Sequence, residues 1–598
     1  MPTKLCGYVS PFDGYKCDTP AYQGSEDGLC IGHTFEIKKS KKAFQSLIIQ
    51  KFKDNDFNFD GFVFPAKFFI KNIRFEGTVS FIGCTFQKGL HFEKVKFLSD
   101  QVRFDQCWFE KKDVFFDRCI FNSPRIVFND SALTSDTIEF RNCGFFGEKL
   151  EFDRVQWKAD KHIAFLACQF RSQSSMFDKA ILKAPVISFF GSSFHGDQFD
   201  FYRTSFETNK LTFKRIKSIK GKINFNETRV RSNVFDLSES MWHDKGMRWQ
   251  KVNWSGDRLL FNDLKSVGAK ISMQRCNLVG NQINWKSMNF DKSTFECLDS
   301  KIHGKKSVSF DNSFVEGRFR FNKTKVNSPA FSMVGCHMKG EDFSLQQSTF
   351  KGNLFALTKS VFETQRASLT RTHIDAEDVR FDYTRFENLQ TSFQSLRADA
   401  ERILFTSSLF ASNRVAFNRT VFNARRTYFD NTNFGSGIVT FWRTDFGGGA
   451  EFNGAKDRGA IIHFNSDLSN VRWEGALMNR CRFHDSKWPT TGWMGRFCSS
   501  DEFPLIKRNN FSQLVEIYSW IASQYSDSNQ DGLKRDFLFS AKEIDRRRLI
   551  QQKLMTPLIK MELRRWMTGY GLGLSHVGLI RGAAVFFTSL APLFVKIR

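Results

Sequence analysis

The sequence predicts a mainly β protein, a long solenoid of stacked coils with a small Cys-rich segment before it and a helical region after it. Three observations support this. Phe and aliphatic residues recur at a fixed step through most of the 598 residues, three Cys and one His gather near the N-terminus, and the apolar period becomes helical after about residue 510. Self-similarity at a fixed period is typical of a solenoid, in which each unit contacts its neighbours.

The repeat has a step of 12 residues in nearly every unit. A unit reads apolar-x-Phe-x-x-small-x-Phe and then about four polar or glycine residues, as in Val102, Phe104, Cys107 and Phe109. Residues i and i+2 of a strand face the same side, so this spacing predicts short strands separated by corners. Four corners make one square coil. We expect Phe to stack on Phe inside it, with the smaller residue filling the space beside each ring.

The repeat predicts a solenoid domain over residues 56–487, with two units per coil and therefore roughly 18 coils. The pattern resembles the pentapeptide-repeat family, with Phe in the place of the central Leu and Cys, Val, Thr, Ser or Ala in the place of the Ala. This resemblance implies a right-handed quadrilateral β-helix. The insertion after every second pentapeptide departs from the family pattern and predicts protruding loops along two edges.

Composition narrows the function classes. Phe occurs 71 times and Tyr nine times, which indicates an architectural use of Phe, because binding hot spots favour Tyr and Trp. The net charge of +25 favours nucleic acid, anionic lipid or an acidic partner without separating them. Cys residues interleaved with Phe, and the absence of a charged-then-apolar leader, favour a reducing cytoplasm.

Residues 1–40 are predicted to form a zinc knuckle. Its ligands would be Cys6, Cys17, Cys30 and His33, with the spacing C-x10-C-x12-C-x2-H. Three thiolates and one imidazole suit tetrahedral Zn²⁺, and four protein ligands make the metal structural. The stretches "GYKC" and "CIGH" are similar to a small Cys3His class at the start of some bacterial and phage proteins and in some chromatin proteins. Two roles stay open for the knuckle, nucleic-acid binding or capping of the first coil.

The chain after the repeat is expected to contain a linker over 488–509, a helical hairpin region over 510–569 and an apolar tail over 570–598. Leu514, Ile517 and Ile521 lie on one face of a helical period. The stretches "SAKEIDRRR" and "TGYG" resemble the tail of membrane-associated bacterial pentapeptide-repeat proteins, in which such a hairpin precedes the membrane.

A basic cluster in this region is the candidate membrane-proximal site. Its members are Arg546, Arg547, Arg548, Lys560, Arg564 and Arg565. The apolar run that follows is shorter than the roughly 20 residues of a membrane span and contains Pro592. We therefore expect peripheral attachment, or a single anchor, at an anionic inner membrane surface. The alternative is a helical tail that only caps the last coil.

Catalytic motifs are absent from the sequence: there is no H-E-x-x-H, Walker loop or nucleophile elbow. We therefore expect neither an enzyme nor a small-molecule substrate. The leading hypothesis is a non-catalytic scaffold, a β-helical rod tethered at the cytoplasmic face of the membrane that recognises a protein partner. The alternative is a nucleic-acid-binding protein that uses the zinc knuckle and the basic surface of the rod.

Overall fold

The computed structural model describes residues 4–11, 14–23, 25–35, 39–110, 112–491, 496–525 and 530–571. These residues form a mainly β structure, a β-solenoid of about 17 turns with a Cys3His group near the N-terminus and helices near the C-terminus. The predicted fold class is therefore confirmed. The chain divides into two compact units, Met1–Ser332 with Met338–Gly340, and Met333–His337 with Glu341–Arg598.

One coil takes about 24 residues, which is two of the predicted 12-residue repeats. In the first unit, four strands form the sides of one coil: β6 (Leu90–Glu93), β7 (Lys96–Leu98), β8 (Gln101–Arg103) and β9 (Trp108–Glu110). The next strand, β10 (Val114–Asp117), pairs with β6 in parallel and places Phe116 opposite Phe92. β6 and β9 belong to one large sheet and β7 and β8 to another, so each sheet uses two sides of the coil.

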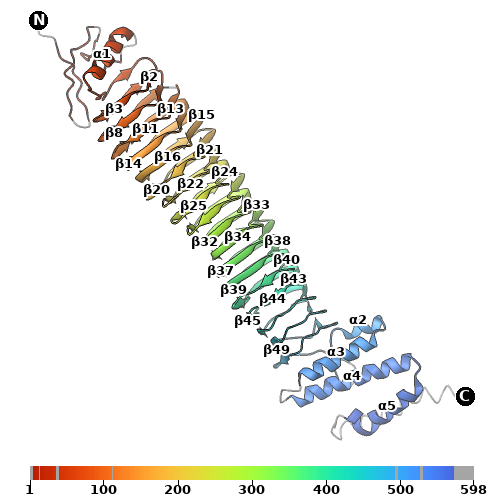
Figure 1. Ribbon diagram of the computed structural model, residues 1–598. Coiled ribbons are helices and arrows are strands. Elements are labelled where there is room, and N and C mark those ends of the chain that lie inside the picture. Colours follow the sequence, from red (N-terminus) through yellow and green to blue (C-terminus); the bar gives the residue numbers. More distant parts are fainter. Residues whose placement is uncertain are drawn as a thin grey trace. The chain divides into compact units, whose positions relative to one another are not determined.

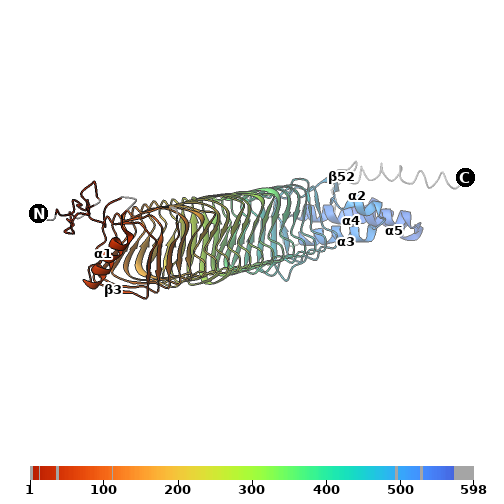
Figure 2. The ribbon, with the colours of Figure 1, turned by 90° about the horizontal axis from the view of Figure 1, so that it is seen from above.

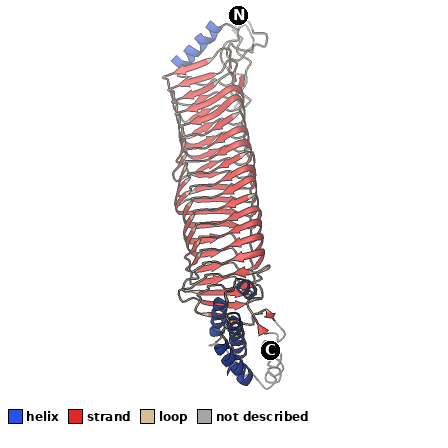
Figure 3. Ribbon diagram, turned by 90° about the vertical axis from the view of Figure 1, so that its right-hand side faces the viewer, coloured by secondary structure: helices blue, strands red, loops and turns tan. Residues whose placement is uncertain are grey.

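In many coils two sides join into one longer strand. Figure 3 shows long strands of this kind in red. Examples are β13 (Ala132–Arg141) and β14 (Gly144–Glu151) in the first unit and β43 (Arg397–Leu404) in the second. The residues inserted after every second pentapeptide were predicted to form protruding loops. In these long strands that prediction is wrong. They stay in the ladder because their backbone groups pair with the neighbouring coil, as Arg402 does opposite Arg426.

The Phe rings stack in interior columns. In the first unit, Phe104 lies between Phe81 and Phe128, with ring centroids 4.8 and 5.0 Å apart and planes within 9° of parallel. In the second unit, Phe417 lies between Phe393 and Phe441 at 4.7 Å on both sides. These separations match the spacing of paired strands, so like residues sit above like residues in both units.

In many repeats the small residue is Cys, Ser or Thr, and its side chain makes a hydrogen bond that the sequence did not predict. The thiol of Cys107 donates to the backbone carbonyl of Phe81 at 2.9 Å, and the hydroxyl of Thr420 donates to that of Phe393 at 2.7 Å. The same bond to a Phe carbonyl of the preceding coil is made by Cys84, Cys119, Cys143, Cys168, Ser192, Thr228, Ser240, Thr432, Thr444 and Ser466. A hydrogen-bond donor therefore stands where the family pattern has Ala.

Between Phe and the small residue the chain turns through a left-handed residue. Gln106 has φ of 55° and Arg118 has φ of 54°, and the pattern continues at about 12-residue intervals. This conformation costs a non-glycine residue about 1–2 kcal/mol. It persists because the amide of the turn residue bonds to the next coil, as Gln106 does to the carbonyl of Asn129 at 2.9 Å.

The N-terminal end of the solenoid is covered by helix α1 (Lys41–Lys53), which begins after an N-cap at Ser40 (Figures 1 and 2). Phe44 of α1 packs against Phe64 with ring centroids 5.6 Å apart, and Phe52 packs against Phe75 at 5.6 Å. A solenoid end exposes unpaired strand edges and apolar side chains, so a covering element is required.

The last coils of the second unit are covered by helices α3 (Phe511–Gln524) and α4 (Asp531–Gln551). Trp473 packs against Trp520 at 5.5 Å, and Trp488 packs against Phe537 at 5.0 Å. The indole of Trp488 also donates to the hydroxyl of Tyr525 at 2.9 Å. Helices α3 and α4 therefore cap the C-terminal end of the solenoid.

Residues 488–509, expected as a linker, contain regular elements. Strands β52 (Thr490–Thr491) and β53 (Arg496–Phe497) form an antiparallel pair, and helix α2 (Glu502–Lys507) follows. Helix α5 (Met555–Thr568) and the short 3-10 helix η1 (Gly569–Gly571) come last in the described chain.

Candidate functional site

The four predicted metal ligands come together at the N-terminal end of the first unit. Antiparallel bridges between Leu5 and Pro20 and between Val9 and Lys16 bring Cys6 near Cys17. Cys30 and His33 lie on a tight turn in which the amide of His33 donates to the carbonyl of Cys30 at 3.0 Å. All four side chains are buried, and their ligand atoms lie within 4.8 Å of one another.

Two of the distances are those of a tetrahedral metal site, whereas Nδ1 of His33 lies closer, at 3.0 Å, to the sulfur of Cys30. The sulfur atoms of Cys17 and Cys30 are 3.9 Å apart, and Nδ1 of His33 lies 3.5 Å from the sulfur of Cys6. Zinc at about 2.3 Å from sulfur and about 2.0–2.1 Å from nitrogen places two sulfurs roughly 3.8 Å apart and a sulfur and a nitrogen roughly 3.6 Å apart. The group can therefore bind one metal ion.

His33 is held in the tautomer that such a site needs. Its Nε2 atom lies 2.9 Å from the carbonyl oxygen of Asp60, so Nε2 carries the proton and Nδ1 faces the sulfurs. Tyr8 stacks on the imidazole with ring centroids 3.9 Å apart. Phe62 meets the imidazole edge to face at 5.0 Å. The sequence analysis missed Tyr8 and Asp60, although Tyr8 stands only two positions after Cys6.

The contact between Cys17 and Cys30 shifts the pKa values of the two thiols in opposite directions. The hydrogen bond with Cys30 lowers the pKa of Cys17 to about 3. The same contact, together with burial, raises the pKa of Cys30 far above its ordinary value. If Cys30 also loses its proton, the two adjacent thiolates repel each other, and a cation between them relieves this repulsion.

A buried lysine joins the knuckle to the first coil. The ammonium group of Lys39 donates to the carbonyls of Ile31 at 3.2 Å and Thr34 at 3.1 Å, and also to that of Val63. Burial lowers the pKa of Lys39 to about 8. The amide of Val63 donates back to the carbonyl of Gly32 at 2.8 Å. The knuckle is therefore packed on the solenoid end.

Comparisons with protein-family models, with curated proteins and with solved structures find no match to this chain. The pentapeptide-repeat resemblance stays a prediction.

The predicted basic cluster divides into paired and exposed members. Arg546 and Arg565 are largely buried between α4 and α5, where they surround two carboxylates. Arg546 lies 3.0 Å from Glu562, and Arg565 lies 2.8 Å from Glu543. The hydroxyl of Tyr570 donates to the same oxygen of Glu543 at 2.8 Å. Burial and this carboxylate raise the pKa of Tyr570.

The remaining four members lie at the surface or near it. Arg547 pairs with Glu502 at 3.6 Å and Arg548 with Asp545 at 2.6 Å. Lys560 and Arg564 are exposed, and the ion pairs found among the described residues do not include them.

The apolar tail predicted for residues 570–598 lies, from residue 572 onward, outside the described residues. In the part of the chain that is described, no helix is both long and apolar enough to cross a membrane.

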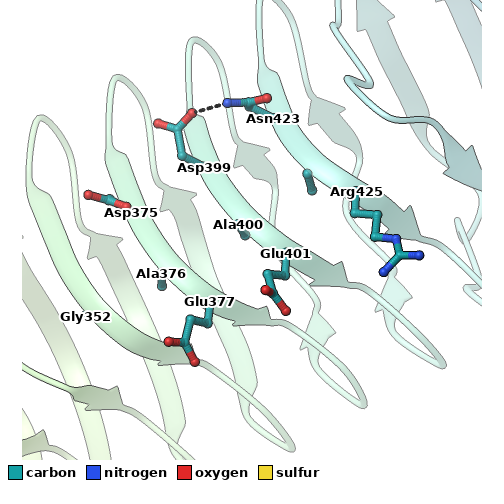
Figure 4. A pocket seen from close by; sticks show the side chains of 10 residues that line it. Gly352, Asp375, Ala376, Glu377, Asp399, Ala400, Glu401, Asn423 and Arg425 are labelled. Atoms are coloured by element: carbon teal, nitrogen blue, oxygen red, sulfur yellow. Dashed lines mark hydrogen bonds between the residues drawn. The ribbon is translucent and has the colours of Figure 1, made fainter.

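A shallow groove of about 580 Å³ lies on one edge of the second unit (Figure 4). Its floor is a column of small residues at 24-residue intervals, namely Gly352, Ala376, Ala400 and Ala424. Asp375 and Asp399 border it on one side, and Glu377 and Glu401 on the other. Arg397 holds the pKa of Asp399 well below its ordinary value.

Among the described residues, the Cys3His group is the one set of three or more ligand-type side chains close enough for a metal ion.

Proposed function

We propose that this chain is a non-catalytic scaffold, a pentapeptide-repeat-like β-helix whose N-terminal knuckle binds zinc and whose tail attaches to the cytoplasmic face of the inner membrane. Its outer faces would recognise a protein partner. The observation that carries this proposal is the regular outer surface. The outward-facing positions of one coil stand next to the equivalent positions of the following coil, about 24 residues later.

The outward-facing positions form ladders that carry both signs of charge. Lys71, Glu93, Asp117 and Arg141 stand one above another on four successive coils. Lys71 pairs with Glu93 at 3.1 Å. Solenoids use extended repetitive faces of this kind to bind partners, and pre-ordered side chains lose little conformational entropy on binding.

Zinc is the metal that this donor set favours. Three thiolates and one imidazole in a tetrahedral group are typical of structural zinc sites, and no ligand position is left open for a substrate. The knuckle contacts the first coil through His33 and Lys39, which supports the capping role over a separate binding role.

Nucleic-acid binding is the second candidate, because the chain carries a net charge of +25. Many Arg side chains of the solenoid pair with a carboxylate one coil away, as Arg154 does with Asp130 at 2.7 Å and Arg402 with Asp378 at 2.9 Å. At these positions carboxylates alternate with Arg side chains, so the surface carries no continuous row of positive charge there, which favours the protein-binding scaffold.

Two measurements separate these functions. The full chain is expected in the membrane fraction of lysed cells at low salt, with partial release by high salt if it is peripheral or release by detergent if it is anchored. Recovery in the soluble fraction at low salt would contradict membrane attachment. Binding to duplex DNA that weakens steeply with rising salt would favour the nucleic-acid function.

A further inference from the structure

Helix α5 exposes an apolar stripe. Met555, Ile559, Leu563 and Met567 are 45%, 55%, 45% and 56% exposed, so four large apolar side chains meet solvent on one short helix. Their spacing of four residues places them in one row along the helix surface. The stripe therefore runs the length of α5.

Another face of α5 packs on α4, and this contact determines which side of the helix faces outward. Leu558 is buried there. Glu562 and Arg565 form the ion pairs with Arg546 and Glu543 described above. Residues 558, 562 and 565 follow the three- and four-residue spacing of one helix face, so the apolar stripe cannot turn inward while these ion pairs hold.

Two basic residues lie beside the stripe. Lys560 follows Ile559 and Arg564 follows Leu563, so each lies about 100° further around the helix. Both side chains are exposed. An apolar row with exposed Lys and Arg along one side is typical of a helix that lies in a membrane interface.

We propose that α5 lies in the interface of an anionic lipid bilayer, with the stripe of Met555, Ile559, Leu563 and Met567 inserted and with Lys560 and Arg564 at the headgroups. This inference rests on the membrane attachment proposed above and names the element that makes it. The positive charges of Lys560 and Arg564 complement the negative charge of anionic lipid headgroups. The sequence after α5 also carries the 14-residue apolar run "GAAVFFTSLAPLFV", so a second apolar segment follows the stripe in the chain.

The test is co-flotation of the purified full chain with vesicles of phosphatidylcholine alone or mixed with phosphatidylglycerol. The apolar variant is Ile559→Ser/Leu563→Ser/Met567→Ser, and the charge variant is Lys560→Gln/Arg564→Gln. Matched controls in the same unit are Leu389→Ser/Leu477→Ser/Phe503→Ser, which are exposed apolar residues elsewhere, and Arg535→Gln/Lys542→Gln, which removes two exposed charges from α4. Thermal unfolding and circular dichroism verify that every variant stays folded.

The parent is expected to bind the anionic vesicles more tightly than the neutral ones. Each basic residue near an anionic surface contributes about fivefold, so the charge variant should lose about 30-fold. The apolar variant should lose roughly tenfold or more on anionic vesicles. Both controls should bind within about twofold of the parent.

The outcomes distinguish this inference from the proposed function. A parent that floats with neither vesicle overturns membrane attachment and this inference together. A parent that binds while the apolar variant binds equally well overturns the role of α5 and leaves the attachment to another segment. A parent that is dimeric by light scattering, with a monomeric apolar variant of unchanged vesicle binding, assigns the stripe to self-association and also overturns the inference.

Discussion

The Nε2 atom of His33 donates a hydrogen bond to the backbone carbonyl of Asp60 at 2.9 Å, which links the metal group to the first coil of the solenoid. The carboxylate of Asp60 in turn accepts from the amide of Ile82 at 2.8 Å, one coil further on. Order in the knuckle is therefore coupled to order at the solenoid end.

Removal of the metal should loosen this end and leave distant coils intact. Without a cation the four ligands lose the ion that holds them together and the knuckle has little apolar core of its own, so it should unfold. We expect a chelator to increase hydrogen exchange in residues 57–86 and to leave residues 393–452 unchanged. If the chelator left the hydrogen exchange of residues 57–86 unchanged as well, this result would contradict the coupling.

Phe116 should be far more important for stability than its neighbour Phe115. Phe116 is buried and stacks on Phe140 at 4.6 Å, whereas Phe115 lies on the outer face beside His91. We expect Phe116→Ala to cost about 3–5 kcal/mol of local stability and Phe116→Leu much less. Phe115→Ala serves as the matched control, with a cost of about 0.5 kcal/mol or less. The measurement is native-state hydrogen exchange of the coils around β10, and similar costs for both Ala variants would refute the interior assignment.

Glu543→Gln should release α5 from α4. The substitution removes the carboxylate that Arg546, Arg565 and Tyr570 share, and breaking a buried ion pair from one side costs roughly 3–5 kcal/mol. Tyr570→Phe removes one hydrogen bond and should cost about 1 kcal/mol. Limited proteolysis is expected to cut α5 fastest in Glu543→Gln, while the exposed Glu516→Gln serves as a neutral control. Resistance of Glu543→Gln equal to that of the control would show that the network does not hold α5.

Asp501 should give the second unit a defined pH dependence. Burial raises the pKa of this carboxyl to about 6, although it accepts hydrogen bonds from the amide of Trp473 at 2.9 and 3.1 Å. The ordinary value is about 4, so between about pH 4 and 6 the folded chain holds a proton that the unfolded chain has lost. The contribution of Asp501 to stability therefore falls as the pH rises through this window.

Asp501→Asn removes this titration. The stability of Asp501→Asn minus that of the parent should increase by up to a few kcal/mol from pH 4 to pH 7. Denaturant unfolding at several pH values measures the difference, in which other titrating groups such as Asp430 cancel. A difference that is flat across this range would exclude the raised pKa.

The repeat made the coil predictable because each unit contains its own inward pattern. The two-residue spacing of Val102 and Phe104 placed both side chains inside, and the step of 12 residues gave the half coil. The metal ligands were also recognisable, since Cys and His at the predicted positions meet in space. Both inferences depend on local spacing.

The features that the sequence did not predict depend on the neighbouring coil. The left-handed turn at Gln106 is not a usual place for Gln, and it is held by the carbonyl of Asn129. The donor role of Cys107 depends on the carbonyl of Phe81 in the preceding coil. The pairing of Glu543 with Tyr570 joins two motifs 27 positions apart, and spacing alone gives no signal for it.

Metal content tests the central claim at the candidate site most directly. Elemental analysis of the purified full chain should find one zinc ion per chain, bound by Cys6, Cys17, Cys30 and His33. Cys17→Ser should lose the zinc. Cys143→Ser, which keeps a hydroxyl donor to the carbonyl of Phe116 inside the solenoid, should retain it. A metal-free parent whose first coil is fully protected from hydrogen exchange would contradict the account.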